Sequence, residues 1–229
     1  MKEYISHIYQ DKTGHWVIQS NEDHTAGVAK LSSQFAAEFG MGVWGKVLGL
    51  LHDKGKESNA FQQHIKKESG YAPETKVIGD YHHAYIGAII ARNLYGKTAN
   101  NFFVNQILSH HSGLHDSDEL DGENSELKKN IPAEVDTNTE KIVLNKLSFK
   151  CEASDMHHLS RMLYSCLVDA DYLDTEAFMD KESSKLRANK TTLKDLLPKL
   201  EAHLGNLKDS AEDTEVNHIR AEVQMQCVQ

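Results

Sequence analysis

Histidine and aspartate side chains form short groups along this chain of 229 residues, and both residue types bind transition metals. The clearest group is His52-Asp53, which follows an apolar run and precedes Gly55 and Lys56. Adjacent residues on a helix point about 100° apart because one turn contains about 3.6 residues. At a helix end the geometry is looser, and Gly55 permits a sharp exit of the chain. The imidazole and the carboxylate can therefore reach one cation together.

Four further groups lie at or near the expected ends of helices, and apolar residues flank each of them. They are His24, His82-His83, His110-His111, and the pair Asp169 and Asp171. A buried charge is unfavourable unless it is paired or bound to a metal, so an aspartate such as Asp171 in an apolar helix needs a partner. A cation is the simplest partner. The candidate metal ligands are therefore His24, His52, Asp53, His83, His110, His111 and Asp171.

Each candidate also has an ordinary structural explanation when it is taken alone. His24 fits the first turn of a helix, His82 fits a solvent-exposed position, and His110 fits a core histidine bonded to a backbone carbonyl. Asp169 and Asp174 are interpreted as surface acids. The other histidines are interpreted as surface or structural residues: His7, His15, His64, His115, His157, His158, His203 and His218. The joint occurrence of seven candidates favours a metal site.

The elements that must carry these groups are predicted to be mainly helices. Apolar residues recur at helical spacing from Val28 to Phe39, with Asn21 or Asp23 as the expected N-cap, and Ser58 is expected to cap the helix that begins there. Helices are expected over residues 21–39, 43–51, 58–69, 81–95, 101–111, 137–149, 156–173, 175–187, 193–204 and 211–228, and a short irregular strand or hairpin over residues 4–20. Few stretches alternate in polarity, and no repeat is found. The predicted fold class is all-α, a globular multi-helix bundle around one core.

The acidic charge is concentrated in one stretch. The net charge is −9, and residues 116–140 contain nine acidic and two basic residues, a net of −7. Residues 116–136 are therefore expected to form a mobile, solvated surface loop. Because phosphate affinity comes from Lys and Arg, this charge neither supports nor excludes a nucleic-acid substrate.

Other features of the sequence concern compartment and domain organisation. No apolar run approaches 18 residues, and the N-terminus lacks the apolar segment of a signal peptide. Cys151, Cys166 and Cys227 show no CxxC spacing and are expected to be free thiols in a reducing cytosol. We therefore expect a cytoplasmic protein with no membrane contact. Residues 1–205 are predicted to form one domain, followed by a C-terminal helix over residues 206–229.

The order His24, His52-Asp53, Asp171 resembles the H…HD…D pattern of the HD superfamily of metal-dependent phosphohydrolases. The longer strings "LLHDKGK" followed by Phe61-Gln62, "HHAYIGA", "LSHHSGLHD" and "LVDADYLDTE" resemble the HD nuclease domain of the CRISPR-associated helicase-nuclease of type I systems. The resemblance runs from about His7 to the C-terminus. The final string "NHIRAEVQMQC" resembles the linker helix that precedes the helicase core in that family.

This resemblance implies an HD-domain bundle that degrades single-stranded DNA with divalent transition metals, in antiviral defence. It implies His24, His52, Asp53 and Asp171 as ligands of one metal, and His83, His110 and His111 around a second metal that Asp53 bridges. Lys56 matches a motif lysine expected to face the phosphate, and Asp171 is preferred to Asp169 because "ADYL" matches the family's "ADxL" form. The implied partners are single-stranded DNA, a superfamily 2 helicase domain, fused or separate, and a Cascade-type CRISPR surveillance complex.

The residue types alone suggest the same chemistry. Two cations about 3.5–4 Å apart polarise a phosphodiester and lower the pKa of a bound water, so no Ser or Cys nucleophile is needed. A mixed imidazole and carboxylate site suits Mn²⁺, Fe²⁺, Co²⁺ or Ni²⁺ better than Mg²⁺. Two alternatives remain open: an HD nucleotide phosphohydrolase with a single metal, and a non-catalytic module whose metal is structural.

Overall fold

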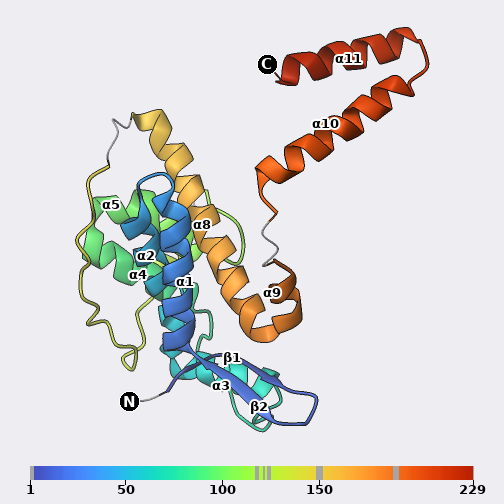
Figure 1. Ribbon diagram of the computed structural model, residues 1–229. Coiled ribbons are helices and arrows are strands. Elements are labelled where there is room, and N and C mark those ends of the chain that lie inside the picture. Colours follow the sequence, from blue (N-terminus) through green and yellow to red (C-terminus); the bar gives the residue numbers. More distant parts are fainter. Residues whose placement is uncertain are drawn as a thin grey trace. The chain divides into compact units, whose positions relative to one another are not determined.

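The computed structural model describes residues 3–116, 119–120, 122, 125–147, 152–187 and 191–228 (Figure 1). Contacts between residues divide the chain into two compact units, Met1–Ser184 (unit 1) and Lys185–Gln229 (unit 2). Helices make up most of the described residues, and the sheet in this part of the chain is one two-stranded hairpin. The all-α fold class expected from the sequence is therefore confirmed.

Unit 1 begins with the expected hairpin. Strands β1 (Ile5–Gln10) and β2 (Trp16–Ser20) pair antiparallel, with a register irregularity between Ile5 and His7. Ser20 then caps the first helix, because its extended backbone lets its hydroxyl accept a hydrogen bond of 3.0 Å from the amide of Asp23. The expectation of Asn21 or Asp23 as the N-cap was therefore wrong by one to three residues.

Three helices pack against one another in the core of unit 1. Helices α1 (Asn21–Ala37) and α2 (Gly42–Leu51) pack side by side, and α8 (Ala153–Met179) packs against both of them (Figure 1). Val28, Leu48 and Leu163 are fully buried where these helices meet. Apolar residues at helical spacing therefore produce the single core that the sequence predicted.

Shorter elements complete this core. A 3₁₀ turn, η1 (Lys54–Glu57), leads to α3 (Asn59–Glu68), whose expected cap Ser58 accepts a hydrogen bond from the amide of Phe61. Helix α4 (Ala84–Tyr95) starts three residues later than expected. His82 therefore precedes the helix, and His83 occupies its N-cap position.

The helical run expected over residues 101–111 starts and ends earlier. It consists of α5 (Lys97–Ala99), the π-helical segment η2 (Asn100–Val104) and α6 (Asn105–Leu108). Asn105 ends the run by folding the chain back, because its amide nitrogen donates to the carbonyl of His115 and its amide oxygen accepts from the amide of the same residue. His110 and His111 therefore lie in a turn rather than on a helix.

Two expectations for the following segment were wrong. Within the acidic stretch, η3 (Glu126–Lys128) forms, and Leu127 and Val135 are buried in the core, so the described part of this stretch is anchored. The helix expected over residues 137–149 is absent from residues 137–147, and residues 148–149 lie outside the described part of the chain. Ile142 and Leu144 pack against the core while Val143 is 87% exposed, a period of two that belongs to an extended chain.

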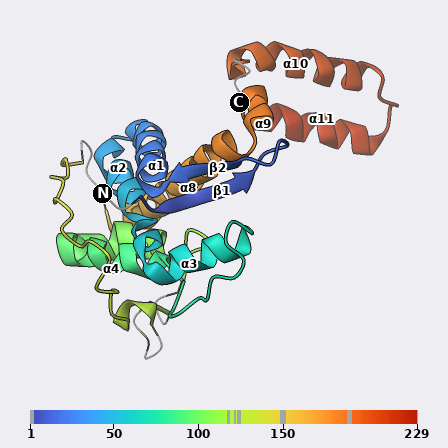
Figure 2. The same ribbon diagram turned by 90° about the horizontal axis from the view of Figure 1, so that it is seen from below.

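Helix α8 extends beyond the expected residue 173, and α9 (Lys181–Arg187) follows after a break at Asp180. Unit 2 contains α10 (Leu193–Asp209) and α11 (Glu215–Val228), which form a helical hairpin (Figures 1 and 2). Helix α10 runs through Gly205, where the sequence analysis placed a domain boundary, and the role of residues 206–229 as a linker stays a prediction.

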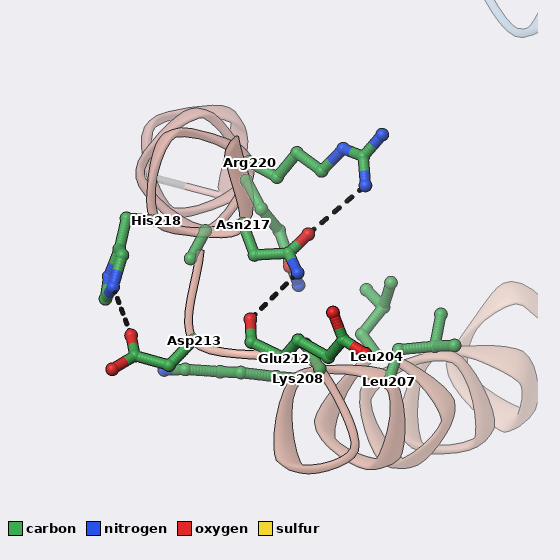
Figure 3. Close-up of a pocket in the computed structure, with 11 residues that line it drawn as sticks. Leu204, Leu207, Lys208, Glu212, Asp213, Asn217, His218 and Arg220 are labelled. Carbon is green, nitrogen blue, oxygen red and sulfur yellow. Dashed lines mark hydrogen bonds and ion pairs between the residues drawn. The ribbon is translucent and has the colours of Figure 1, made fainter. Parts of the chain in front are cut away.

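A pocket lies between the two helices of unit 2 (Figure 3). Asn217 donates a hydrogen bond to the carbonyl of Glu212, and Arg220 donates one to the side chain of Asn217. These contacts fix the turn between the helices. The pocket contains neither of the metal-ligand groups described below.

The sequence predicted a chain without membrane-spanning helices and with free cysteines. Among the described residues, every helix is too short or too polar to cross a lipid bilayer. Cys166 and Cys227 are free thiols, and Cys151 lies outside the described residues.

Replacement of Leu163 by Ala is expected to lower the free energy of unfolding by about 2–5 kcal/mol, because it removes a fully buried side chain from the contact of α8 with the core. Met162→Ala on the same helix is the matched control, since Met162 is 44% exposed, and it should change stability by less than about 0.5 kcal/mol. Urea unfolding followed by circular dichroism measures both. Equal losses in the two variants would contradict the assigned core.

Candidate metal centre

Histidine and aspartate side chains meet inside unit 1 in two groups that share Asp53. The first group contains His24, His52, Asp53 and Asp171, and the second contains Asp53, His83, His110 and His111. Within each group the potential ligand atoms all lie within 4.8 Å of one another. The structure therefore brings together all seven residues that the sequence analysis selected as candidate ligands.

In the first group, two imidazoles face two carboxylates. Nε2 of His24 lies 3.2 Å from Oδ2 of Asp53 and 3.2 Å from Oδ1 of Asp171. Nε2 of His52 lies 3.3 Å and 3.7 Å from the same two oxygens. Asp169 is exposed two residues before Asp171 and belongs to neither group. Four atoms from three separate helical elements therefore surround one point in space.

In the second group, the other oxygen of Asp53 faces three imidazoles. Nε2 of His83 lies 3.2 Å from Oδ1 of Asp53, and Nε2 of His110 lies 3.4 Å from it. Nε2 of His111 lies 3.0 Å from Nε2 of His83. Asp53 thus offers Oδ2 to one group and Oδ1 to the other, which is the arrangement of a bridging carboxylate.

Close backbone packing brings His83 to Asp53 although the two are far apart in the sequence. A Cβ atom at Gly55 would overlap the carbonyl oxygen of His83, so only glycine lets the η1 turn approach the start of α4 this closely. Asn21 holds the same turn from the other side, because its side chain donates a hydrogen bond of 3.2 Å to the carbonyl of Asp53.

Hydrogen bonds orient the rings so that each Nε2 points into the centre. Nδ1 of His52 lies 2.8 Å from the carbonyl oxygen of Gly49, and Nδ1 of His110 lies 2.6 Å from that of Ile107. A carbonyl can only accept, so these Nδ1 atoms donate. Such bonds to the far nitrogen are the usual way in which proteins orient metal-binding histidines.

The inward atoms of the centre lack hydrogen-bond partners. Nε2 of His24, His52 and His110, and Oδ1 of Asp53, are buried and make no hydrogen bond. Buried polar atoms without a hydrogen bond are rare, because burial removes their bonds to water, and the ion-pair contacts described above do not replace those bonds in good geometry. A cation between these atoms would satisfy all of them, and imidazole with carboxylate is a donor set that first-row transition metals accept. The buried cluster therefore fits a metal ion.

The carboxylates make the first group strongly attractive to positive charge. Burial alone would lower the pKa of His24, but Asp171, Asp174 and Asp53 raise it to about 10. Burial also opposes protonation of His52, and Asp53 and Asp171 raise its pKa to about 9. Both rings are therefore in the protonated, charged form at neutral pH, and a metal ion must displace one proton from each.

In the second group the pKa values of two histidines are lowered instead. Partial burial and the neighbouring rings of His110 and His83 lower the pKa of His111 to about 4. Burial also lowers the pKa of His83. Both rings are neutral at pH 7, and a neutral imidazole keeps one unprotonated nitrogen that can bind a cation. Burial would raise the pKa of Asp53, but His52 and Lys56 hold it well below its usual range, so the shared carboxylate is ionised.

Lys56 lies beside the carboxylate that the two groups share. It is only 5% exposed, and its Nζ atom lies 2.6 Å from Oδ2 of Asp53 and 3.1 Å from the hydroxyl of Ser6. The side chain of Gln62 donates to the carbonyls of Lys56 and Ile5, which ties this lysine to the hairpin. Lys56 therefore positions Asp53 and compensates its negative charge, and its contact with a phosphate stays a prediction.

Asp174, expected to be a surface acid, is instead part of the centre. Its carboxylate is 16% exposed, and Oδ2 lies 2.8 Å from Nδ1 of His24 and accepts a hydrogen bond of 2.8 Å from Gln19. A side chain at Gly27 would overlap this carboxylate. The available signal was the spacing of Asp171 and Asp174, which places both on one face of α8.

His7 is the second missed residue. Its ring packs edge-on against that of His24, with 4.6 Å between centroids, and its Nδ1 atom lies 2.8 Å from the side-chain oxygen of Gln19. Burial, Lys56 and His24 lower its pKa to about 4, so it is neutral beside His24. No spacing pattern links His7 to the other histidines, so the sequence offered no signal for it.

Comparison with known proteins adds no further constraint. No model of a known protein family matches the chain, and no curated protein shows significant sequence similarity to it. The case for a metal centre therefore rests on the geometry of these residues.

Metal binding at pH 7 is expected to release about two protons, because His24 and His52 must each lose one. Their pKa values lie above the ordinary 6.5, so metal affinity should rise as the pH rises from 6 towards 9. Titration calorimetry with Mn²⁺ in two buffers of different ionisation enthalpy measures the proton count. An affinity that is constant between pH 6 and pH 8 would contradict the first group as the binding site.

Replacement of Asp174 by Ala is expected to weaken Mn²⁺ binding by about 10–100-fold, because His24 loses the carboxylate that orients it. Asp169→Ala, an exposed acid on the same helix, is the matched control and should bind Mn²⁺ as the wild type does. Calorimetry gives the affinities, and thermal unfolding checks that both variants are folded. Equal affinities in a folded Asp174→Ala chain would rule out this role.

Proposed function

We propose that this chain is a metal-dependent nuclease of the HD type that hydrolyses phosphodiester bonds in single-stranded DNA. The single observation that carries the proposal is the position of Asp53, whose two oxygens face two separate histidine groups. A single-metal nucleotide phosphohydrolase needs only the first group. The second group, with His83, His110 and His111, is what favours a two-metal phosphodiesterase.

The chemistry that a metal pair supplies when bound is the neutralisation of phosphoryl charge and the acidification of water. The residues of this chain would hold the metal pair. His24, His52 and Asp53 are at most 1% exposed, so they form the closed floor of the centre. The side chains of His83 and Asp171 are 14% and 16% exposed, and His111 is exposed. A phosphodiester therefore approaches from the side of these three residues.

Lys56 contributes to the same centre without facing solvent. Its ammonium group pairs with Asp53 at 2.6 Å and keeps that carboxylate ionised at the point where both histidine groups meet. The residues with catalytic roles in this proposal are the metal ligands, and Lys56 is a positioning residue.

The net charge of −9 is part of the proposal. An acidic chain attracts DNA phosphates weakly, so the isolated chain should bind DNA with low affinity that falls further with salt. A helicase partner that threads a single strand to the centre would compensate for this. A superfamily 2 helicase and a CRISPR surveillance complex remain the proposed partners, and they rest on the sequence resemblance alone.

The chain stripped of metal and reloaded with Mn²⁺, Co²⁺, Ni²⁺ or Fe²⁺ is expected to cut circular single-stranded DNA, and Mg²⁺ should give weak activity. Asp53→Ala should abolish cutting while the helical circular dichroism spectrum is retained, since it removes the shared ligand. Gel analysis of the circular substrate measures internal cutting, and parallel reactions with deoxynucleoside triphosphates test the nucleotide alternative.

Asp169→Ala, purified in the same way, controls for contaminating nuclease and should retain full activity. Full activity of Asp53→Ala after reloading with Mn²⁺ would overturn the assigned site. Activity with Mg²⁺ far above that with Mn²⁺ would overturn the assigned class of metal, and hydrolysis of nucleotides but not of DNA would favour the single-metal alternative.

A further inference from the structure

Three aromatic rings form a parallel stack beside the metal centre. The rings of His64 and Tyr81 lie 4.0 Å apart between centroids with 9° between their planes, and those of Tyr81 and His82 lie 5.0 Å apart with 15°. Among the described residues no ring contact joins His64 to His82, so Tyr81 lies between them. Neither histidine is a candidate ligand, and the metal centre leaves this stack without a role.

The stack is a direct continuation of the second ligand group. On α3, Phe61 and His64 are three residues apart and lie on one face of the helix. Phe61 packs edge-on against His83, with 5.0 Å between centroids, and His64 stacks on Tyr81. The segment that contains Tyr81, His82 and His83 therefore runs along α3 and leads from the stack to a ligand of the centre.

The stack is exposed and yet held in place. The side chain of His82 is 68% exposed, and Tyr81 is 40% exposed, so these rings do not contribute a buried core. The carboxylate of Asp80 lies 2.7 Å from Nδ1 of His82 and accepts from its backbone amide at 3.0 Å, and Lys129 binds the other oxygen of Asp80 at 2.7 Å. An exposed ring that is fixed in advance loses little conformational entropy when a ligand stacks on it.

We propose that the His64–Tyr81–His82 stack is a platform on which the bases of a single strand stack while the strand's phosphodiester lies at the metal centre. This proposal rests on the proposed nuclease function and adds the group that recognises the strand. The bases of a duplex are already paired and stacked, whereas those of a single strand are free to stack on aromatic rings. The platform therefore selects single strands.

Stacking also provides affinity for DNA that an acidic chain cannot obtain from its net charge. The net charge is −9, and Lys129, a cation beside the stack, is already bound by Asp80 and by Glu126 at 2.6 Å. This lysine is therefore not free to bind a phosphate. Stacking of a base on a ring does not depend on phosphate charge, and it tolerates any base because every base has a π-face.

The test compares binding of two fluorescent oligomers to the full chain in EDTA, by anisotropy. One oligomer is oligothymidylate, and the other has the same length and phosphates but no bases. The wild type should bind the thymidylate at least about tenfold more tightly than the abasic oligomer. His82→Ala and Tyr81→Leu should each lose about tenfold in thymidylate affinity and leave the abasic affinity unchanged, whereas Tyr81→Phe keeps the ring and should bind as the wild type does.

Tyr71→Leu is the matched control, since Tyr71 is 43% exposed in the same unit but packs edge-on against Trp16 outside the stack. It should leave both affinities unchanged. Equal binding of the two oligomers by the wild type, or unchanged thymidylate affinity in both His82→Ala and Tyr81→Leu, would overturn the platform. His82→Ala removes an exposed side chain, so it remains informative if Tyr81→Leu fails to fold.

Cleavage kinetics with Mn²⁺ separate this inference from the nuclease proposal. The platform predicts that His82→Ala raises KM for single-stranded DNA about tenfold with little change in kcat, because it removes binding and no ligand. Cutting by the wild type with an unchanged KM in His82→Ala would overturn the platform alone. Ring-dependent binding of thymidylate without any cutting would support the platform and overturn the nuclease.

Discussion

The buried carboxylate of Asp53 is the interaction on which the rest of the site depends. It is 1% exposed and stands within 3.4 Å of the imidazoles of His24, His52, His83 and His110 and of the ammonium of Lys56. An ionised carboxylate without partners would be far too unfavourable at this depth. The fold must therefore bring these nitrogen atoms close to Asp53, and the elements around the site are arranged accordingly.

Most of these nitrogen atoms belong to residues at the ends of helices. His52 follows α2 directly, His83 precedes α4, and His110 stands in the turn after α6. At a helix end the backbone still offers carbonyl groups, and those of Gly49 and Ile107 fix the rings of His52 and His110. Asp171 contributes a carboxylate oxygen instead, from within the long helix α8, which packs against α1. Helix α6 ends before His110 and helix α4 starts after His83, and both boundaries differ from those expected because these residues form the site.

The two histidine groups differ in chemistry although they share a ligand. Carboxylates dominate the first group and raise the pKa of His24 and His52, whereas burial and neighbouring imidazoles lower the pKa of His83 and His111 in the second. A cation thus competes with protons at one position and meets neutral rings at the other. The exposed side of the centre continues into the ring stack of His64, Tyr81 and His82, so one short segment carries two rings of the proposed base platform and the metal ligand His83.

The sequence by itself determined the all-α class, the N-terminal hairpin, the cap at Ser58 and the residue types of the centre, because these follow from apolar spacing and from the chemistry of neighbouring residues. The tertiary structure decided the rest. Residues 137–147 are extended because Ile142 and its neighbours pack on a distant core, and Tyr95 bonds both backbone groups of Ile142. Asp174 orients His24 across 150 residues, and the two oxygens of Asp53 are assigned to different groups only once α2, α4 and α8 meet. Contacts between residues so far apart leave no local pattern in a single sequence, and for that reason only the folded chain reveals them.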